Sequence, residues 1–245
     1  MIAGRGSAVG AVAVVILGGI ASGAHAEPRA VVELFTSQGC SSCPPADKLL
    51  GELRNDPALV VVSLPVHYWD YLGWKDTLAD PRHTARQKAY SLMRGDGDVY
   101  TPQVVVNGAA HALGSDRAAI EKAVDTARSR GAHLAVTVEI AVVNGQVSVT
   151  VGKGEEGLAG EVWLWAVAST VPVSIRRGEN KGRTVTYANV VRRWVKLGDW
   201  LGPGNWTVPL ADVKAEMVDS VAVIVQSGSP SKPGAILGAG VAPLR

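Results

Sequence analysis

Two short stretches near the start of the chain are almost continuously apolar, which is typical of strands buried on both faces of a sheet. They are residues 30–36 (AVVELFT) and residues 59–66 (LVVVSLPV). Between them, apolar side chains recur at the spacing of a helix, at Ala46, Leu49, Leu50 and Leu53. The pattern predicts a β-α-β unit, whose right-handed crossover brings the ends of both strands to one edge of the sheet.

The stretch that follows predicts a second helix and then a β-β-α unit. An Asp-Pro pair at residues 80–81 has the pattern of a helix cap followed by a first-turn proline. Residues 101–113 (TPQVVVNGAAHAL) predict two strands joined at an Asn-Gly turn. Ser115 is the expected cap of a last helix that stops at Gly131. Residues 27–131 are therefore expected to form an α/β domain.

The pattern changes from His133 onward, where apolar and polar residues alternate as in strands with one buried face. An Asn-Gly pair at residues 144–145 predicts a tight turn between the first two of these strands. Further strands are predicted in EVWLWAVAS, RTVTYANVVRRW, NWTVPL and SVAVIVQ. Many short strands separated by Gly and Pro favour an all-β, sandwich-like domain over residues 132–245. The junction is short, so we expect the two domains to pack together.

The first 26 residues have the pattern of a secretory signal peptide. Arg5 supplies a basic start, residues 8–20 are apolar or small, and residues 24–26 (AHA) form an A-x-A cleavage signature. The apolar run is too short to span a bilayer and no stop-transfer stretch follows, which disfavours the alternative of an N-terminal anchor. We therefore expect an exported chain, periplasmic or secreted, with no membrane insertion of its mature part.

Composition narrows the function classes. Hydrophobic residues make up 47% of the chain and charged residues 19%, which argues for folded, globular material. The formal net charge is only +2, so there is no electrostatic case for nucleic acid or an acidic membrane as a partner.

The chain has only two cysteines, Cys40 and Cys43, in the stretch TSQGCSSCPPAD. Export permits a disulfide, but a loop this short stabilises a fold by only about 2 kcal/mol, so the pair is better suited to redox chemistry than to stapling. Cys40 stands just before the predicted helix, where unsatisfied backbone N–H groups favour a thiolate. The alternatives are an inert structural disulfide and a metal site with His67, His83 or His111 as a further ligand.

Topology brings three distant features to the edge of the sheet that holds the cysteines. The aromatic loop, defined as residues 67–80, follows the second strand of the β-α-β unit. The third strand belongs to an antiparallel hairpin, so it begins at this same edge, with Thr101 and Pro102 at its start. Ligand sites of open α/β sheets lie outside such an edge.

A C-x-x-C motif in a β-α-β pattern, with a downstream Thr-Pro opening a hairpin strand, resembles the thioredoxin superfamily over roughly residues 29–131. A narrower resemblance spans nearly the whole mature chain. The stretches that carry it are ELFTSQGCSSCPPAD, YWDYLGWKD, TARQKAY, VYTPQVVVNG and RGENKGRTVTYANVV. They are similar to a bacterial secreted family known only as a domain of unknown function, DUF1223. The resemblance implies a thioredoxin-like domain followed by a β-domain, and no particular substrate.

The thioredoxin resemblance implies roles for individual residues. Cys40 would be the attacking thiol and Cys43 the resolving thiol, while Pro102 would form a cis peptide bond that faces them and shapes a peptide-binding groove. The function expected is a thiol–disulfide oxidoreductase without a bound cofactor. Its partners would be exported proteins that bear thiols or disulfides, and an unidentified redox partner. This expectation requires exposed sulfur atoms. The alternative is a non-catalytic protein that binds a metal or a partner.

Several residues near the cysteines are candidates for supporting roles. Trp69 and Tyr71 of the aromatic loop would form a substrate wall, or else a small core beneath that loop. Glu33, His67 and Asp70 are candidates for proton transfer. For Glu33, a solvated position at the edge of the sheet is the interpretation that we favour.

One further stretch is rich in positive charge. Residues 176–183 (RRGENKGR) contain four basic residues and one Glu. A solvated hairpin loop is the simplest interpretation. The alternatives are a docking surface for a partner protein and a contact to the other domain.

Overall fold

The computed structural model describes residues 28–244 of the chain. The signal peptide expected at residues 1–26 lies outside the described residues. Among the helices in residues 28–244, none is long and apolar enough to cross a membrane.

The first half of the chain has the element order that the sequence predicts. Its elements are β1 (Ala30–Thr36), α1 (Pro44–Leu53), β2 (Leu59–Pro65), the short 3-10 helix η1 (Asp70–Leu72), α2 (Pro81–Arg94), β3 (Gln103–Val106), β4 (Ala110–Leu113) and α3 (Arg117–Ser129). β1 pairs in parallel with β2 and antiparallel with β3. The segment after β1, the segment after β2 and the segment before β3 therefore meet at one edge of the sheet.

The sequence predicts the cap residues of two helices in this half, and the structure confirms one of them. Asp80 caps α2 as expected, because its side chain accepts a hydrogen bond from the backbone N–H of Arg82. The prediction for α3 is wrong by one residue. Asp116 is the cap instead of Ser115, since the Asp116 carboxylate accepts from the backbone N–H of Ala119.

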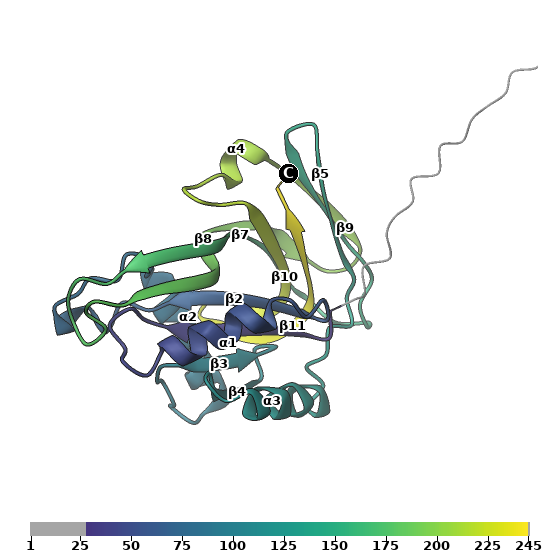
Figure 1. Ribbon diagram of the computed structural model, residues 1–245. Coiled ribbons are helices and arrows are strands. Elements are labelled where there is room, and N and C mark those ends of the chain that lie inside the picture. Colours follow the sequence, from purple (N-terminus) through teal and green to yellow (C-terminus); the bar gives the residue numbers. More distant parts are fainter. Residues whose placement is uncertain (1–27, 245) are drawn as a thin grey trace, which may run out of the picture.

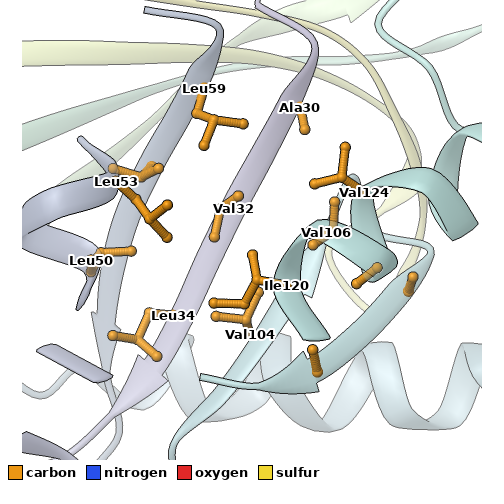
Figure 2. Close-up of a cluster of buried hydrophobic side chains, with 14 of the residues drawn as sticks. Ala30, Val32, Leu34, Leu50, Leu53, Leu59, Val104, Val106, Ile120 and Val124 are labelled. Carbon is orange, nitrogen blue, oxygen red and sulfur yellow. The ribbon is translucent and has the colours of Figure 1, made fainter. Parts of the chain in front are cut away.

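The side chains of β1 alternate between two cores. On one face, Ala30, Val32 and Leu34 join a core that also contains side chains of α1 and α3. Figure 2 shows β1 in this core, with Leu50 of α1 on one side and Ile120 of α3 on the other. The opposite face of β1 packs in a second core, to which α2 contributes. Thus α1 and α3 cover one face of the sheet, and α2 covers the other.

The second half of the chain contains β5 (Val138–Val143), β6 (Gln146–Val151), β7 (Gly160–Ser174), β8 (Thr184–Trp200), β9 (Gly204–Pro209), α4 (Leu210–Val213), β10 (Ser220–Ser229) and β11 (Lys232–Pro243). Four of these strands extend the sheet of the first half, in the order β11-β10-β7-β8-β2-β1-β3-β4. The two halves meet where Ser63 of β2 pairs in parallel with Val190 of β8. The two regions that the sequence predicts as separate domains thus share one eight-stranded sheet.

The remaining strands form a second sheet, in the order β5-β6-β9. The inward side chains of β6, among them Val147 and Val149, pack with side chains of β7 and β10 in a third core. Figure 1 shows β5, β9 and the C-terminus at one end of the molecule and α3 at the other. The small sheet therefore covers a part of the large sheet that is remote from α3.

Candidate functional site

Cys40 and Cys43 form a disulfide, with their Cα atoms 5.4 Å apart. Cys43 is the cap residue of α1, and prolines occupy the first two helical positions, where a backbone donor is not needed. The backbone N–H of Cys43 donates to the carbonyl of Cys40 at 3.2 Å, which closes a tight turn before the helix. The pair therefore lies at the start of a helix, as the sequence predicts.

The expectation that the sulfur atoms are exposed is wrong for this state of the protein. Cys40 is 2% exposed and Cys43 is fully buried. Ser41 and Ser42 between them are exposed, and the Ser42 hydroxyl lies 3.4 Å from the sulfur of Cys40. The disulfide is thus almost fully covered, although the two residues between the cysteines are exposed.

Trp69 connects the segment around the cysteines, residues 37–43 and here called the cysteine segment, to the start of β3. A Cβ atom added at Gly39 would lie 3.0 Å from the Cβ of Trp69, so the chain needs glycine at this position. The Trp69 indole N–H donates to the Thr101 hydroxyl at 2.8 Å. Its ring stacks on Tyr71 with centroids 6.4 Å apart, and Tyr71 is 76% exposed. The structure thus brings together the aromatic loop, Thr101 and the residue before Cys40.

Pro102 lies beside the first turn of α1. The Thr101–Pro102 peptide bond is cis, as expected. A Cβ atom added at Gly114 would lie 3.2 Å from Pro102 and 3.3 Å from Ala46 of α1, which places these side chains around one spot. Pro102 is therefore a neighbour of the helix that the disulfide opens.

The structure overturns the favoured expectation for Glu33. Its side chain is fully buried on the α2 side of β1. Arg86 donates its Nε–H to one carboxylate oxygen at 2.5 Å, and the Tyr90 hydroxyl donates to the other at 2.7 Å. Gln226 of β10 donates in turn to the Tyr90 hydroxyl. Glu33 is therefore ion-paired within the first half, and the hydrogen bond between Tyr90 and Gln226 links this group to the second half, on the face of the sheet opposite to α1.

The other two candidates for proton transfer bond elsewhere. The Nδ1 atom of His67 lies 2.9 Å from the hydroxyl of Thr84 in α2. The carboxylate of Asp70 accepts from the backbone N–H of Asp76 at 3.1 Å and so stabilises the aromatic loop. The structure does not place either side chain in hydrogen-bond contact with the disulfide.

The two other histidines that were candidates for a metal ligand, His83 and His111, are also engaged. His83 is buried with its Nδ1 atom 2.9 Å from the carbonyl of Pro65. His111 lies with Asp96 and Asp98 in a cluster whose potential ligand atoms are within 4.8 Å of one another. Arg94 already donates to both carboxylate oxygens of Asp96, at 2.7 and 3.2 Å, and its positive charge opposes a cation there. Neither histidine supplies a third ligand to the cysteines.

Comparison with known proteins places the chain in a family. The family model described as "Protein of unknown function (DUF1223)" matches residues 31–226. The chain belongs to the DUF1223 family. A crystal structure of a protein from Agrobacterium tumefaciens, determined by a structural genomics consortium, is 32% identical, with 88% of this chain and 94% of that chain covered and a TM-score of 0.78.

A second solved structure, HBP35 of Porphyromonas gingivalis, shares the fold alone. It is 14% identical to this DUF1223 protein, with 89% of this chain and 76% of that chain covered and a TM-score of 0.58. No curated protein matches the chain.

Asp47, one helical turn beyond Cys43 in this DUF1223 protein, is a residue of the site that was not predicted from the sequence. Its side chain is 2% exposed, and neither carboxylate oxygen has a hydrogen-bond partner within residues 28–244. Burial raises the pKa of Asp47, the nearby Thr36 hydroxyl lowers it and the charge of Asp76 raises it, and the net result is a pKa of about 8. A signal was present, because Asp47 lies at i+4 from Cys43, and thus on the same side of the helix.

Gln38 is a second missed residue, and it connects the cysteine segment to the aromatic loop of this DUF1223 protein. Its backbone N–H donates to the carboxylate of Asp76 at 2.8 Å, and its side-chain oxygen accepts from the indole N–H of Trp74 at 2.7 Å. Asp76 also accepts from the backbone N–H of Leu78, and burial raises the pKa of Asp76. No local pattern in the sequence indicates these contacts.

Two further missed residues come from the connection between β7 and β8, in the second half of this DUF1223 protein. The side chain of Asn180 is buried and donates to the backbone carbonyls of Gln38 and Cys40, at 2.9 and 2.8 Å. The Glu179 carboxylate accepts from the backbone N–H of Ser41 at 3.3 Å. Of the alternatives for this basic stretch, a contact to the other half of the chain is therefore present.

Proposed function

We propose that this DUF1223 protein is an exported thiol–disulfide oxidoreductase without a bound cofactor. In this proposal a thioredoxin-like domain (residues 27–131) carries the reactive pair Cys40 and Cys43, and a sandwich-like β-domain (residues 132–245) supports it. The observation that carries the proposal is the disulfide at the start of α1, with Asp47 one turn behind it, whose carboxyl group has no hydrogen-bond partner among residues 28–244. Its substrates would be exported proteins that bear thiols or disulfides.

The reaction exchanges two electrons. The Cys40 thiolate attacks a substrate disulfide, which forms a mixed disulfide and releases one substrate thiolate. The Cys43 thiolate then attacks the sulfur of Cys40, which forms the internal disulfide and releases the second substrate thiolate. The substrate gains two electrons and the protein loses two, and a dithiol partner protein returns the pair to the reduced form. In the opposite direction the same steps oxidise a substrate dithiol.

Groups near the pair fit the needs of each step. Before attack, the start of α1 and the hydroxyl of Ser42 favour a thiolate at Cys40. Cys43 must lose its proton before it attacks, and Asp47 is the titratable group on its side of the helix. A carboxyl group with a pKa of about 8 is close to the value of an ordinary thiol, so a proton passes between them at little cost.

The surface beside the pair would receive the substrate chain. Trp69 packs on Gly39 and bonds Thr101, while Tyr71 presents an exposed ring next to Trp69. Pro102 lies beside the first turn of α1. An aromatic wall opposite an extended segment suits a peptide that lies across the disulfide.

The test is a pair of matched variants of the mature protein. Cys43→Ser leaves the attacking thiol without a resolving partner, so it should trap mixed disulfides with exported proteins in intact cells. Cys40→Ser removes the attacking thiol and should trap none. Nonreducing gels and mass spectrometry of the adducts measure the difference. Equal trapping by the two variants, or none by either, would contradict the proposal.

A further inference from the structure

The connection between β7 and β8, residues 175–183 and here called the β7–β8 loop, lies against the segment that holds the disulfide. Gly178 and Gly182 adopt positive φ values of 75° and 83°, which few other residues adopt without strain. The backbone N–H of Gly182 donates to the carbonyl of Ile175 at 2.8 Å and closes the loop. Between the glycines, Glu179 and Asn180 meet the cysteine segment.

Asn180 fixes the backbone on both sides of Gly39. Its amide group donates to the carbonyls of Gln38 and Cys40, and its own side-chain oxygen has no partner in the part of the chain that the structure describes. Leaving a buried carbonyl without a donor costs about 1–3 kcal/mol. A movement that separates the loop from the Cys40 backbone would break both of these bonds, so Asn180 opposes it.

Glu179 acts on the peptide group that follows Cys40. Its carboxylate accepts from the backbone N–H of Ser41, a donor that would otherwise favour a thiolate at Cys40. The loop also carries four exposed cations that form no ion pair with a carboxylate among residues 28–244: Arg176, Arg177, Lys181 and Arg183. Glu179 is the one acidic residue of the loop. Its charge opposes the formation of a second negative charge at Cys40.

We infer that the β7–β8 loop controls the reactivity of the disulfide. Asn180 is a positioning residue that holds the Cys40 segment closed, and Glu179 favours the disulfide over the dithiol by disfavouring the Cys40 thiolate. This inference rests on the proposed function only in that it concerns the same cysteine pair. The second half of the chain thereby sets how readily the first half exchanges electrons.

The charge of Glu179 is tested by equilibrium with glutathione. Two glutathione thiols reduce the disulfide to a dithiol and leave as one glutathione disulfide, so atoms and electrons balance. Glu179→Gln keeps an oxygen that accepts from Ser41 but removes the charge. It should shift the equilibrium constant toward the dithiol by about 3–10-fold, which is about 15–30 mV. Glu156→Gln removes the same charge from an exposed position in the loop before β7 and should shift nothing.

The role of Asn180 as a positioning residue is tested by the rate at which dithiothreitol reduces the disulfide of the folded protein. Asn180→Ala should raise this rate at least tenfold, and Asn180→Gln, which keeps the amide group, should raise it less. Circular dichroism under the same conditions verifies that each variant is folded. A folded Asn180→Ala protein that is reduced at the wild-type rate would overturn the role of Asn180. An unchanged glutathione equilibrium in Glu179→Gln would overturn the role of Glu179.

Both measurements use small thiols, so they are independent of any protein substrate. If Cys43→Ser traps no partner but the Glu179→Gln equilibrium shifts, the proposed function fails and the inference stands. If partners are trapped and neither variant of the loop changes the reactivity, the inference fails and the function stands.

Discussion

The protein buries two acidic side chains on opposite sides of its first β-α-β unit, and the two differ in their hydrogen-bond partners. Glu33 on β1 has one partner for each oxygen, Arg86 and Tyr90. Asp47 on α1 is equally buried, yet it has no hydrogen-bond partner within the described chain. Burial alone therefore does not reveal what a buried acid does.

The two sites differ in whether a positively charged partner compensates the negative charge of the acid. Around Glu33, the Arg86 guanidinium also lies 4.8 Å from the ring centre of Tyr90 and 4.9 Å from that of Trp165, so the ion pair is part of the packing between α2 and the sheet. Around Asp47, the nearby Thr36 hydroxyl offsets only a part of the desolvation, and the pKa of the carboxyl group is raised to about 8. A satisfied buried acid stabilises structure, whereas an unsatisfied one beside a disulfide is suited to chemistry.

The largest effect is expected from breaking the satisfied site. Arg86→Met leaves Glu33 buried without its cation and should lower the free energy of unfolding by about 3–5 kcal/mol. Urea denaturation of the oxidised protein measures this loss. In the double variant Glu33→Gln/Arg86→Met no buried charge is left, so it should recover a substantial part of the loss. If the double variant were as unstable as the single one, packing of the guanidinium would explain the effect, and the contrast with Asp47 would be lost.

The next effect is a dependence of stability on pH that comes from the unsatisfied site. Folding raises the pKa of Asp47 from 3.8 to about 8, so the folded state holds a proton that the unfolded state releases. The contribution of Asp47 to the free energy of unfolding is therefore fully present below about pH 4, and it is lost as the pH rises toward 8. Asp47→Asn removes this titration.

The stability of Asp47→Asn relative to the wild type should accordingly increase by up to about 1.4 kcal/mol per pH unit over this window. Urea denaturation at pH 5, 6 and 7 under nonreducing conditions provides the measurement. A constant difference between the two proteins would mean that Asp47 is not protonated in the folded state.

The helices, strands and turns that surround these sites were largely predictable, because local sequence patterns encode them. The helical spacing of apolar residues after Cys43, the buried runs of β1 and β2, and the Asn107-Gly108 turn between β3 and β4 each depend on neighbours in the sequence. Their order then determined which strand ends share an edge. The placement of Trp69 against Gly39 and Thr101 followed from that edge.

The contacts that decide the chemistry were not predictable, because their partners are far apart in the chain. Asn180 is 140 residues from Cys40, and its role depends on the pairing of β2 with β8, which alternation of apolar residues does not specify. Glu33 shows the same limit. A lone acid in an apolar strand indicates either an edge or a buried partner, and only the position of Arg86 decides between them.

The smallest effect is expected from Thr36. Its buried hydroxyl forms no hydrogen bond among the described residues, but as a dipole near Asp47 it is the one group that lowers the pKa of that carboxyl. Thr36→Val keeps the shape of the side chain, so stability at pH 4 should change by less than about 1 kcal/mol. The Asp47 titration should move to higher pH. Ser63→Ala removes another buried and unpartnered hydroxyl, one that does not contribute to the pKa of Asp47, and should leave the titration in place. If both variants moved the titration equally, the local environment of Asp47 would not be what keeps it protonated.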